Sequence, residues 1–327
     1  MRKPSLDTSS EQSLQFAKSC IRKCTQDHPD CGDGSEEPLP TRILCIGTVE
    51  NPTVYLRDTA TESSRYVCLS HCWGNRAQDS TMLQATTENI LEFKKNIPWS
   101  ELPKTFRDAI CFVRLLGIGY IWIDSMCIIQ DDPADCAREV GQMASIYSNA
   151  FLTIAATSAS GPHEGLFSTT TQTSVAQILP GGALNAEFSG YGPVYAHPKI
   201  HHTWEEPVNF PLLKRGWVLQ ERMLSRRVLH FTKKELMWEC LSASGCECRS
   251  ASHVGHRHKK DFISIERIRS QLSDWGDIVR VYSSLRLTLD ADTLPALSGL
   301  ASVWKNAFQD RYLAGLWRHR LLYGLLW

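Results

Sequence analysis

An α/β fold built on a parallel sheet is predicted by three features of this sequence. The run Tyr120–Ile123 is apolar, β-branched and aromatic, and it ends abruptly on an aspartate, as a buried strand does. Helical patterns lie before it, at 104–116, and after it, at 134–148. Further apolar strand-like runs stand outside these helices, at 66–70 and 151–155. The resulting order β-α-β-α-β implies crossover connections and therefore parallel strands.

The elements before this core are short. An amphipathic helix is expected over 10–28, because Pro29 follows it and proline ends helices. Residues 30–40 read as a loop, and short strands are expected at 42–46 and 53–56.

The two core helices are predicted from apolar stripes at helical spacing. The first stripe consists of Phe106, Ala109, Ile110, Val113 and Leu116, and Gly117 follows it as a cap. The second stripe consists of Val140, Met143, Ile146 and Tyr147.

The second half of the chain is less regular. A Ser/Thr/Gly-rich loop is expected at 157–175 and a mobile Gly/Ser/His-rich loop at 243–260. Between them, short strands are expected at 194–196, 227–231 and 236–240, on either side of residues 214–223. The chain after residue 260 shows helical patterns.

Three parts of the chain are predicted from this organisation. They are an N-terminal helix and loop over 1–41, one main domain over 42–240, and a loop with a helical extension over 241–327. The last residues are apolar and helical without a cap, so we expect the natural protein to continue beyond 327.

Composition excludes several classes of protein. Among the 327 residues, Lys+Arg and Asp+Glu both number 35, so the chain has no net charge that would attract nucleic acid or anionic lipid. No apolar run approaches the ~18 residues of a membrane span, and the polar N-terminus lacks the apolar core of a signal peptide. Several of the 12 cysteines stand in apolar runs, which favours a reduced, cytoplasmic protein with buried thiols.

Polar side chains follow two strands of the predicted sheet. Ser70, Trp73 and Gly74 come after the first core strand, and Asp124 and Cys127 come after the second. The carboxyl ends of parallel strands meet at one edge of a sheet, where ligands bind in open α/β folds. With Asp131, Asp132 and Glu139 these residues form an acidic cluster in which a carboxylate pKa can rise enough for acid–base catalysis.

Structural interpretations compete with the functional ones. Asp124 and Asp132 can cap the turns that follow them, and Glu139 can pair with Arg138 or Arg215. Arg215 and Glu221 can form a structural ion pair, and Trp73 can belong to the core. Ser70, His71 and Cys72 are consecutive and point alternately to opposite faces, so they do not predict a Ser-His-Asp triad.

Two groups of cysteines and histidines have spacings that only loosely match metal sites. The first is Cys20, Cys24, His28 and Cys31, with three of the four on one helix face; the second is Cys240, Cys246, Cys248, His253, His256 and His258. A packed helix face and a loop explain them more simply, so the sequence predicts no metal site.

The motifs, taken in order, resemble the fungal heterokaryon incompatibility (HET) domain. The matching blocks are Tyr66-Val-Cys-Leu-Ser-His-Cys-Trp-Gly74, Leu102–Ile110, Tyr120–Asp132, Glu139–Ala150 and Arg215–Glu221, followed by Leu224-Ser-x-Arg227. The upstream Cys24-x3-His28-x2-Cys31 and Pro40–Leu44 also match. His71 stands where the family usually has Tyr, and Cys136 stands where Trp is common.

This resemblance implies an intracellular protein of nonself recognition that triggers cell death. HET domains are distantly similar to TIR domains, which have a flavodoxin-like parallel sheet, self-assemble, and in several lineages cleave NAD. The TIR catalytic glutamate follows the third strand, where this chain has Glu164, but only Glu139 belongs to a HET motif. We therefore expect Glu139 to be the functional glutamate.

Two functions remain open at this point. As an NAD glycohydrolase, the domain would use Glu139 and Asp124 for catalysis and bind NAD as its substrate through Ser70, Trp73, Gly74, Cys127, Gln130, Asp132, Arg215, Gln220 and Glu221, with no other cofactor. As a non-catalytic module, it would act through self-association or through other cell-death proteins. A Cys127 nucleophile is a third possibility, although no histidine is placed beside it by the sequence.

We also expect Arg215 to bridge Asp124, Asp132 or Glu139, because crowded carboxylates repel each other.

Overall fold

The computed structural model describes residues 5–74, 82–170, 210–248 and 274–325, together with 177–178, 195–196 and residue 259. Its centre is one eight-stranded mixed sheet. Across the sheet the strands are β12 (Ser244–Cys246), β11 (Leu236–Cys240), β10 (Arg227–Phe231), β7 (Leu152–Ala155), β5 (Val67–Ser70), β6 (Tyr120–Trp122), β2 (Arg42–Gly47) and β3 (Pro52–Asp58).

The predicted parallel core is confirmed. Strands β10, β7, β5 and β6 pair in parallel, with Leu69 opposite Ile154 and Val67 opposite Ile121. Every residue of β5, β7 and β10 is buried, as expected of parallel strands covered on both faces. Antiparallel strands extend the sheet at both edges, β2 and β3 beyond β6, and β11 and β12 beyond β10.

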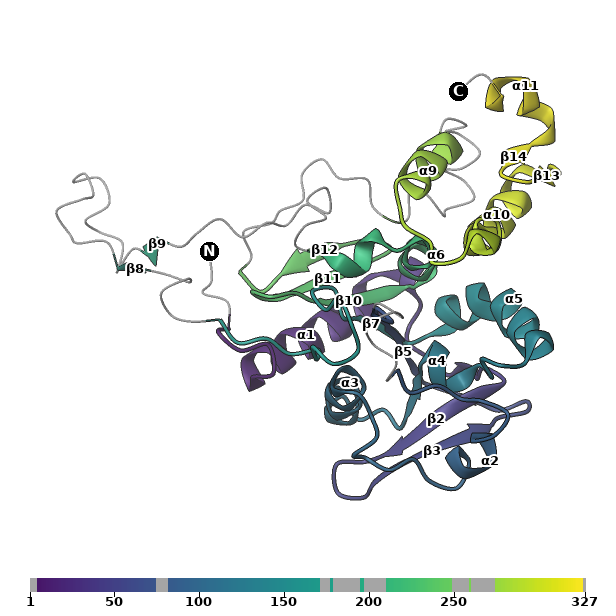
Figure 1. Cartoon of the computed structure of the whole chain (residues 1–327). Helices are drawn as coiled ribbons and strands as arrows, with labels where there is room; N and C mark the ends of the chain where they lie inside the picture. Colours follow the sequence, from purple (N-terminus) through teal and green to yellow (C-terminus); the bar gives the residue numbers. More distant parts are fainter. Residues whose placement is uncertain are drawn as a thin grey trace, which may run out of the picture.

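Helices cover both faces of this sheet (Figure 1). Helix α3 (Lys104–Leu115) packs Phe112 edge-on against Phe231 of β10, with ring centroids 5.0 Å apart, and α1 (Glu11–Asp27) lies beside it against β11. On the other face, Tyr147 of α5 (Pro133–Asn149) contacts Trp122 of β6 at 5.7 Å, and α6 (Gly216–Leu224) packs next to α5.

The helix boundaries follow local sequence signals. Asp132 caps α5, because its Oδ1 accepts hydrogen bonds from the N–H groups of Ala134 and Asp135 at 2.9 and 3.2 Å. Gly117 ends the turn after α3 with φ +77°, a conformation that favours glycine.

The C-terminal residues form a second, smaller core. It contains α9 (Asp274–Ser283), α10 (Pro295–Phe308), the hairpin β13 (Tyr312–Leu313) and β14 (Leu316–Trp317), and α11 (Leu321–Gly324). Trp275, Trp304 and Trp317 pack together at its centre, and α10 packs against α5 and α6. The predicted helical character of this region is confirmed.

The remaining elements are short. They are η1 (Pro29–Cys31), β1 (Glu37–Pro38) paired with β4 (Ser63–Ser64), α2 (Ile90–Phe93), α4 (Asp124–Cys127), β8 (Gln177–Ile178) paired with β9 (Tyr195–Ala196), η5 (Pro211–Lys214), η6 (Asp290–Asp292) and η7 (Arg318–Arg320). Residues 171–175 and 249–258 of the two predicted loops lie outside the described residues, as do His253, His256 and His258. Among the described helices, none has the length and apolar character required to cross a bilayer.

Candidate functional site

The carboxyl edge of β5 and β6 holds a cluster of polar side chains. Asp124 begins α4 directly after β6, and His71 and Trp73 follow β5. Nε2 of His71 lies 3.0 Å from Oδ1 of Asp124, and Nε1 of Trp73 donates to its Oδ2 at 2.9 Å. The expectation that the residues after these two strands meet at one edge is therefore confirmed for Asp124 and Trp73.

The Asp124 carboxylate is ionised and well held. Burial alone would raise its pKa, but the charge interaction and hydrogen bond with His71, the indole N–H of Trp73 and the N–H of Ser125 outweigh burial and lower it. The Asp124 side chain is 22% exposed, whereas that of His71 is 1% exposed. The carboxylate thus presents a fixed negative charge at the end of the sheet.

His71 is a candidate site residue that the sequence analysis did not include in its predicted site. Its Nδ1 lies 3.2 Å from the carbonyl oxygen of Cys72, and its ring packs edge-on against Phe106 at 5.0 Å. These contacts fix the ring, so that Nε2 points at Asp124. Gly74 follows with φ +81°, the left-handed region that favours glycine.

Glu139 lies in a different network, centred on Arg42. The Arg42 guanidinium donates through Nε to the carbonyl oxygen of Cys127 at 2.7 Å and through Nη2 to Asp135, and Nη2 lies 3.7 Å from Glu139 Oε1. Arg138 pairs with the same Glu139 oxygen at 3.3 Å and with Asp135. The alternative interpretation of Glu139 as an ion-pair partner of Arg138 is thereby confirmed, although its Oε2 has no hydrogen-bond partner among the described residues.

Glu221 is a second buried carboxylate beneath the edge. Burial raises the pKa of Glu221 to about 7, and the nearby charge of Asp124 adds to this effect, although Ser70, Arg215 and Tyr147 act in the opposite direction. The pKa values of Glu221 and Asp124 are therefore shifted in opposite directions, and the charge of Asp124 contributes to the shift of Glu221. Opposite shifts of this kind also occur in catalytic acid–base pairs.

Three other candidate residues make structural contacts. The carboxylate of Asp132 is the cap of α5. Gln130 donates to the carbonyl oxygens of Asp124 and Ile128 at 3.2 and 3.1 Å, and Gln220 accepts from the N–H of Gly299 in α10 at 2.8 Å. These residues support the shape of the site and its attachment to the C-terminal core.

Arg215 does not make the predicted bridge. Among the described residues, it forms no ion pair of 4.0 Å or less with Asp124, Asp132 or Glu139. Arg215 stands at the start of α6, and its backbone pairs with that of Arg286, which directs this segment toward the C-terminal core. Its positive charge instead lowers the pKa of Glu221, whereas Arg42 takes the bridging role for Glu139.

Cys127 is unsuited to nucleophilic catalysis. Its side chain is buried, and burial raises the pKa of the thiol to about 12. A reactive cysteine requires a lowered pKa, because the thiolate is the nucleophile. Glu164, the other glutamate considered, is exposed and accepts hydrogen bonds from Ser160 within its own loop.

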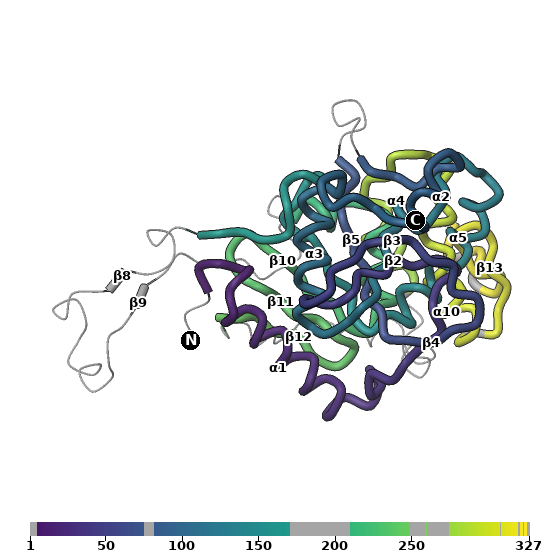
Figure 2. Tube along the Cα trace, turned by 90° about the horizontal axis from the view of Figure 1, so that it is seen from below, coloured from purple at the N-terminus to yellow at the C-terminus, as the bar shows by residue number. Residues whose placement is uncertain are grey.

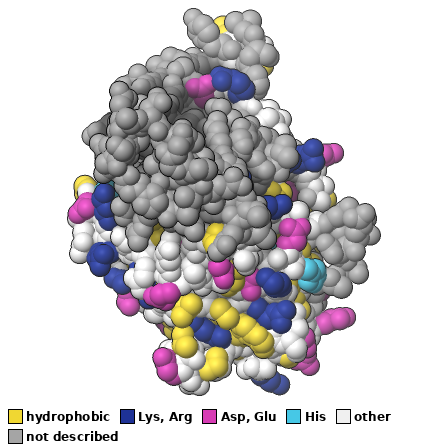
Figure 3. Space-filling view, turned by 90° about the vertical axis from the view of Figure 1, so that its left-hand side faces the viewer, with side chains coloured by type: hydrophobic (Ala, Val, Ile, Leu, Met, Phe, Trp, Pro, Cys, Tyr) yellow, Lys and Arg dark blue, Asp and Glu magenta, His cyan; other side chains and the backbone are white. Residues whose placement is uncertain are grey.

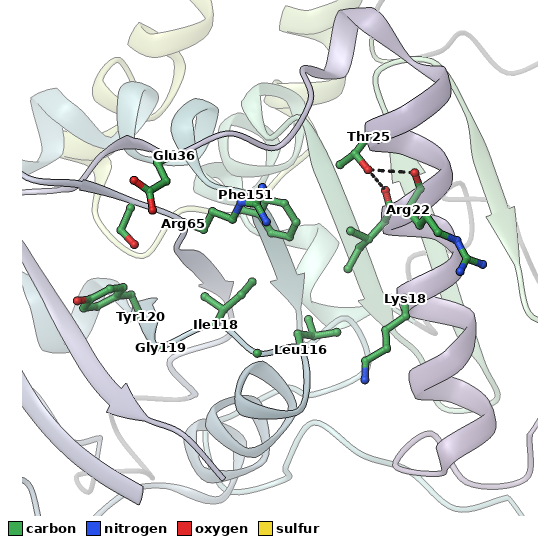
Figure 4. Close-up of a pocket in the computed structure, with 13 residues that line it drawn as sticks. Lys18, Arg22, Thr25, Glu36, Arg65, Leu116, Ile118, Gly119, Tyr120 and Phe151 are labelled. Carbon is green, nitrogen blue, oxygen red and sulfur yellow. Dashed lines mark hydrogen bonds between the residues drawn. The ribbon is translucent and has the colours of Figure 1, made fainter. Parts of the chain in front are cut away.

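The opposite, amino edge of the sheet carries a cavity of about 600 Å³ (Figure 4). Figure 4 shows α1, with Lys18 and Arg22, on the other side of the cavity from Arg65, Phe151 and Tyr120. Arg65 stacks over the Phe151 ring at 5.2 Å. The cavity is lined by a flat ring and mixed charges but has no pair of carboxylates, so the chemistry of the carboxyl edge defines the candidate site.

Charged side chains of both signs lie on one face of the described residues (Figure 3). On the face drawn in Figure 3, acidic and basic side chains alternate, and a group of hydrophobic side chains lies between them. This distribution agrees with the zero net charge of the chain.

Comparison with known proteins gave one result. Residues 66–221 match the family model described as heterokaryon incompatibility protein (HET). No curated protein and no solved structure matched the chain. The matched residues run from the strand that precedes His71 to Glu221, and thus include both carboxylates of the candidate site.

Proposed function

We propose that this chain, whose residues 66–221 are a heterokaryon incompatibility (HET) domain, is a fungal nonself-recognition effector that triggers cell death by hydrolysing NAD. The active site would lie at the carboxyl edge of β5 and β6, and the protein would act in the cytoplasm. The observation that carries the proposal is the ionised Asp124, held by His71 and Trp73 next to the high-pKa Glu221.

The strand order supports a TIR-like interpretation of the domain. In chain order, the parallel strands β5, β6, β7 and β10 occupy the spatial order β6-β5-β7-β10. This is the 2-1-3-4 arrangement of flavodoxin-like sheets, in which ligands bind at the carboxyl ends near the central strand. Ser70 and His71 lie at that end of β5.

The chemistry of NAD hydrolysis fits two carboxylates of this kind. As the bond between ribose C1′ and the nicotinamide nitrogen breaks, its electron pair leaves with nicotinamide, and positive charge develops on the ribose. Asp124 would stabilise that charge electrostatically. Water then adds to C1′ and releases a proton, which Glu221, with a pKa of about 7, can accept at neutral pH.

Replacing Asp124 with asparagine should lower the rate of nicotinamide release by about 100-fold or more, because the neutral amide cannot stabilise the ribosyl cation. The full chain would be incubated with NAD, and nicotinamide would be measured by chromatography. Asp131→Asn is the matched control, since Asp131 is exposed and bonds only to Thr87 among the described residues. Equal rates for the two variants, or no release by the wild type even at high protein concentration, would contradict the proposal.

A non-catalytic assembly module is the second candidate. It is favoured by the structural engagement of Glu139, Asp132 and Gln220 in ion pairs, a cap and an interhelical bond. In that case, Asp124→Asn would keep full toxicity in a fungal cell, and the wild type would release no nicotinamide.

A further inference from the structure

A group of thiols and one imidazole meets on the opposite side of the sheet from α5. It consists of Cys24 in α1, His28 at the end of that helix, Cys31 in η1, and Cys240 at the end of β11. The three sulfur atoms and Nδ1 of His28 all lie within 4.8 Å of one another. Cys24, Cys31 and Cys240 are buried, and His28 is half-buried. We infer that these four residues bind one structural zinc ion.

The geometry fits a tetrahedral ion. With Zn–S bonds of ~2.3 Å and a Zn–N bond of ~2.0 Å, neighbouring ligand atoms around zinc stand roughly 3.5–3.8 Å apart. Nδ1 of His28 and Sγ of Cys240 are 3.4 Å apart, and no pair in the group exceeds 4.8 Å. Three sulfurs and one imidazole are a common donor set of closed structural zinc sites, and soft thiolates in this geometry select zinc over magnesium or calcium.

A buried cation beside the group points to negative charge on the sulfurs. Arg227 is 1% exposed, and its Nε donates to Cys24 Sγ at 3.3 Å. Its remaining donors reach the carbonyl oxygens of Phe151, Cys31 and Gly32. No carboxylate among the described residues lies within ion-pair distance of this guanidinium, although a buried charge without a counter-charge is strongly unfavourable.

A zinc complex supplies the missing counter-charge. Three thiolates and a neutral imidazole around Zn²⁺ carry one net negative charge, which balances Arg227. The N–H of Ala243 also donates to Cys240 Sγ at 3.2 Å, a contact that stabilises a thiolate ligand and orients it.

The proposed site differs from the sequence analysis, which predicted no metal. Spacing alone grouped Cys20 with Cys24, His28 and Cys31, but Cys20 is not among the four that converge. The fourth ligand is Cys240, which stands 212 residues from His28 in the sequence and belongs to the second cysteine group. Only the packing of α1 against β11, visible in Figures 1 and 2, brings the two groups together.

The complex would hold the two flanks of the HET domain together. All four ligands are protein side chains, so no open position is left for a substrate, and the role is structural. Cys24, His28 and Cys31 precede the family match at 66–221, and Cys240 follows it. Zinc would therefore fasten α1 to the β11 edge of the sheet.

Zinc content is the direct test. The full chain, purified under reducing conditions, should contain one zinc per chain by elemental mass spectrometry. Cys24→Ser and Cys240→Ser should each lose that zinc, whereas Cys20→Ser, on the same helix, should keep it. Cys246→Ser should also keep it, which separates this site from the neighbouring group of Glu235, Cys246 and Cys248.

Because a cysteine variant can lose zinc simply by failing to fold, a second measurement uses the wild type alone. Replacement of zinc by Co²⁺ should give the visible absorption of a tetrahedral ion with thiolate charge-transfer bands. Absence of stoichiometric zinc after purification and after anaerobic zinc titration would overturn the inference. So would a disulfide among Cys24, Cys31 and Cys240 in peptides mapped without reduction, or zinc loss confined to the Cys246 variant.

Discussion

Replacing Arg42 with alanine should lower the free energy of unfolding by about 3–5 kcal/mol, because it leaves two buried carboxylates with only the half-exposed Arg138 as a cation. The Arg42 side chain is 7% exposed, and those of Asp135 and Glu139 are 3% and 1% exposed. The guanidinium also satisfies the carbonyl oxygen of Cys127. Urea unfolding followed by circular dichroism measures the change.

The matched control is Arg57→Ala. Arg57 forms an ion pair with Glu62, but the two side chains are 32% and 50% exposed, so the loss should stay below about 1 kcal/mol. Combining Arg42→Ala with Asp135→Asn and Glu139→Gln should recover part of the stability, because the buried negative charges are then removed. A loss for Arg42→Ala as small as that for Arg57→Ala would show that the network is exposed to water.

Replacing Glu221 with glutamine should stabilise the protein by roughly 3 kcal/mol at a pH of about 8 and leave it nearly unchanged at a pH of about 4. The folded-state pKa of Glu221 is about 7, above the ordinary value of 4.5. Below 4.5 the carboxyl is protonated in both states, so it makes no difference to stability. Between 4.5 and 7 the unfolded chain releases its proton first, so stability falls as the pH rises through this window.

Thermal or urea unfolding of wild type and variant across this pH range measures that difference. Glu88→Gln, which removes an exposed carboxyl, is the control and should show no such pH-dependent gain. A constant difference between wild type and Glu221→Gln at all pH values would mean that the pKa of Glu221 is the same in the folded and unfolded states, and would contradict the prediction. The stability that is lost at neutral pH, when Glu221 ionises in the folded protein, is consistent with a carboxyl placed for chemistry rather than for stability.

The parallel core was predictable because its signals are local. The apolar runs of β5, β6 and β7 and the stripes of α3 and α5 can each be read within about 15 residues. The edge strands β2, β3 and β11 were also found individually, but their places in the sheet were not, and β12 lies in a segment that was expected to be a loop. Antiparallel pairing of β2 with β6 joins segments separated by three strands and two helices, and no local pattern encodes that choice.

The site was predictable only in part, for the same reason. Asp124 could be placed at the carboxyl edge, since it directly ends a strand. The sequence could not pair Arg42 with Asp135, which is 93 residues away. The signal that it did offer was a charged residue at the start of an apolar strand. Charge alone suggested Arg215 as the bridging cation, but charge does not say which of several arginines the fold brings close.

The strand order has a consequence for how the protein is made. The growing chain leaves the ribosome from its N-terminus, yet β10 and β11, which cover one side of β7 and receive α1, lie at 227–240. Until those residues emerge, β7 has an open edge and α1 has no partner strand, and unpaired strand edges of this kind favour aggregation. Glu221 is also translated late, so the part of the fold that brings it to the carboxyl edge is complete only after nearly all of residues 66–221 have been synthesised.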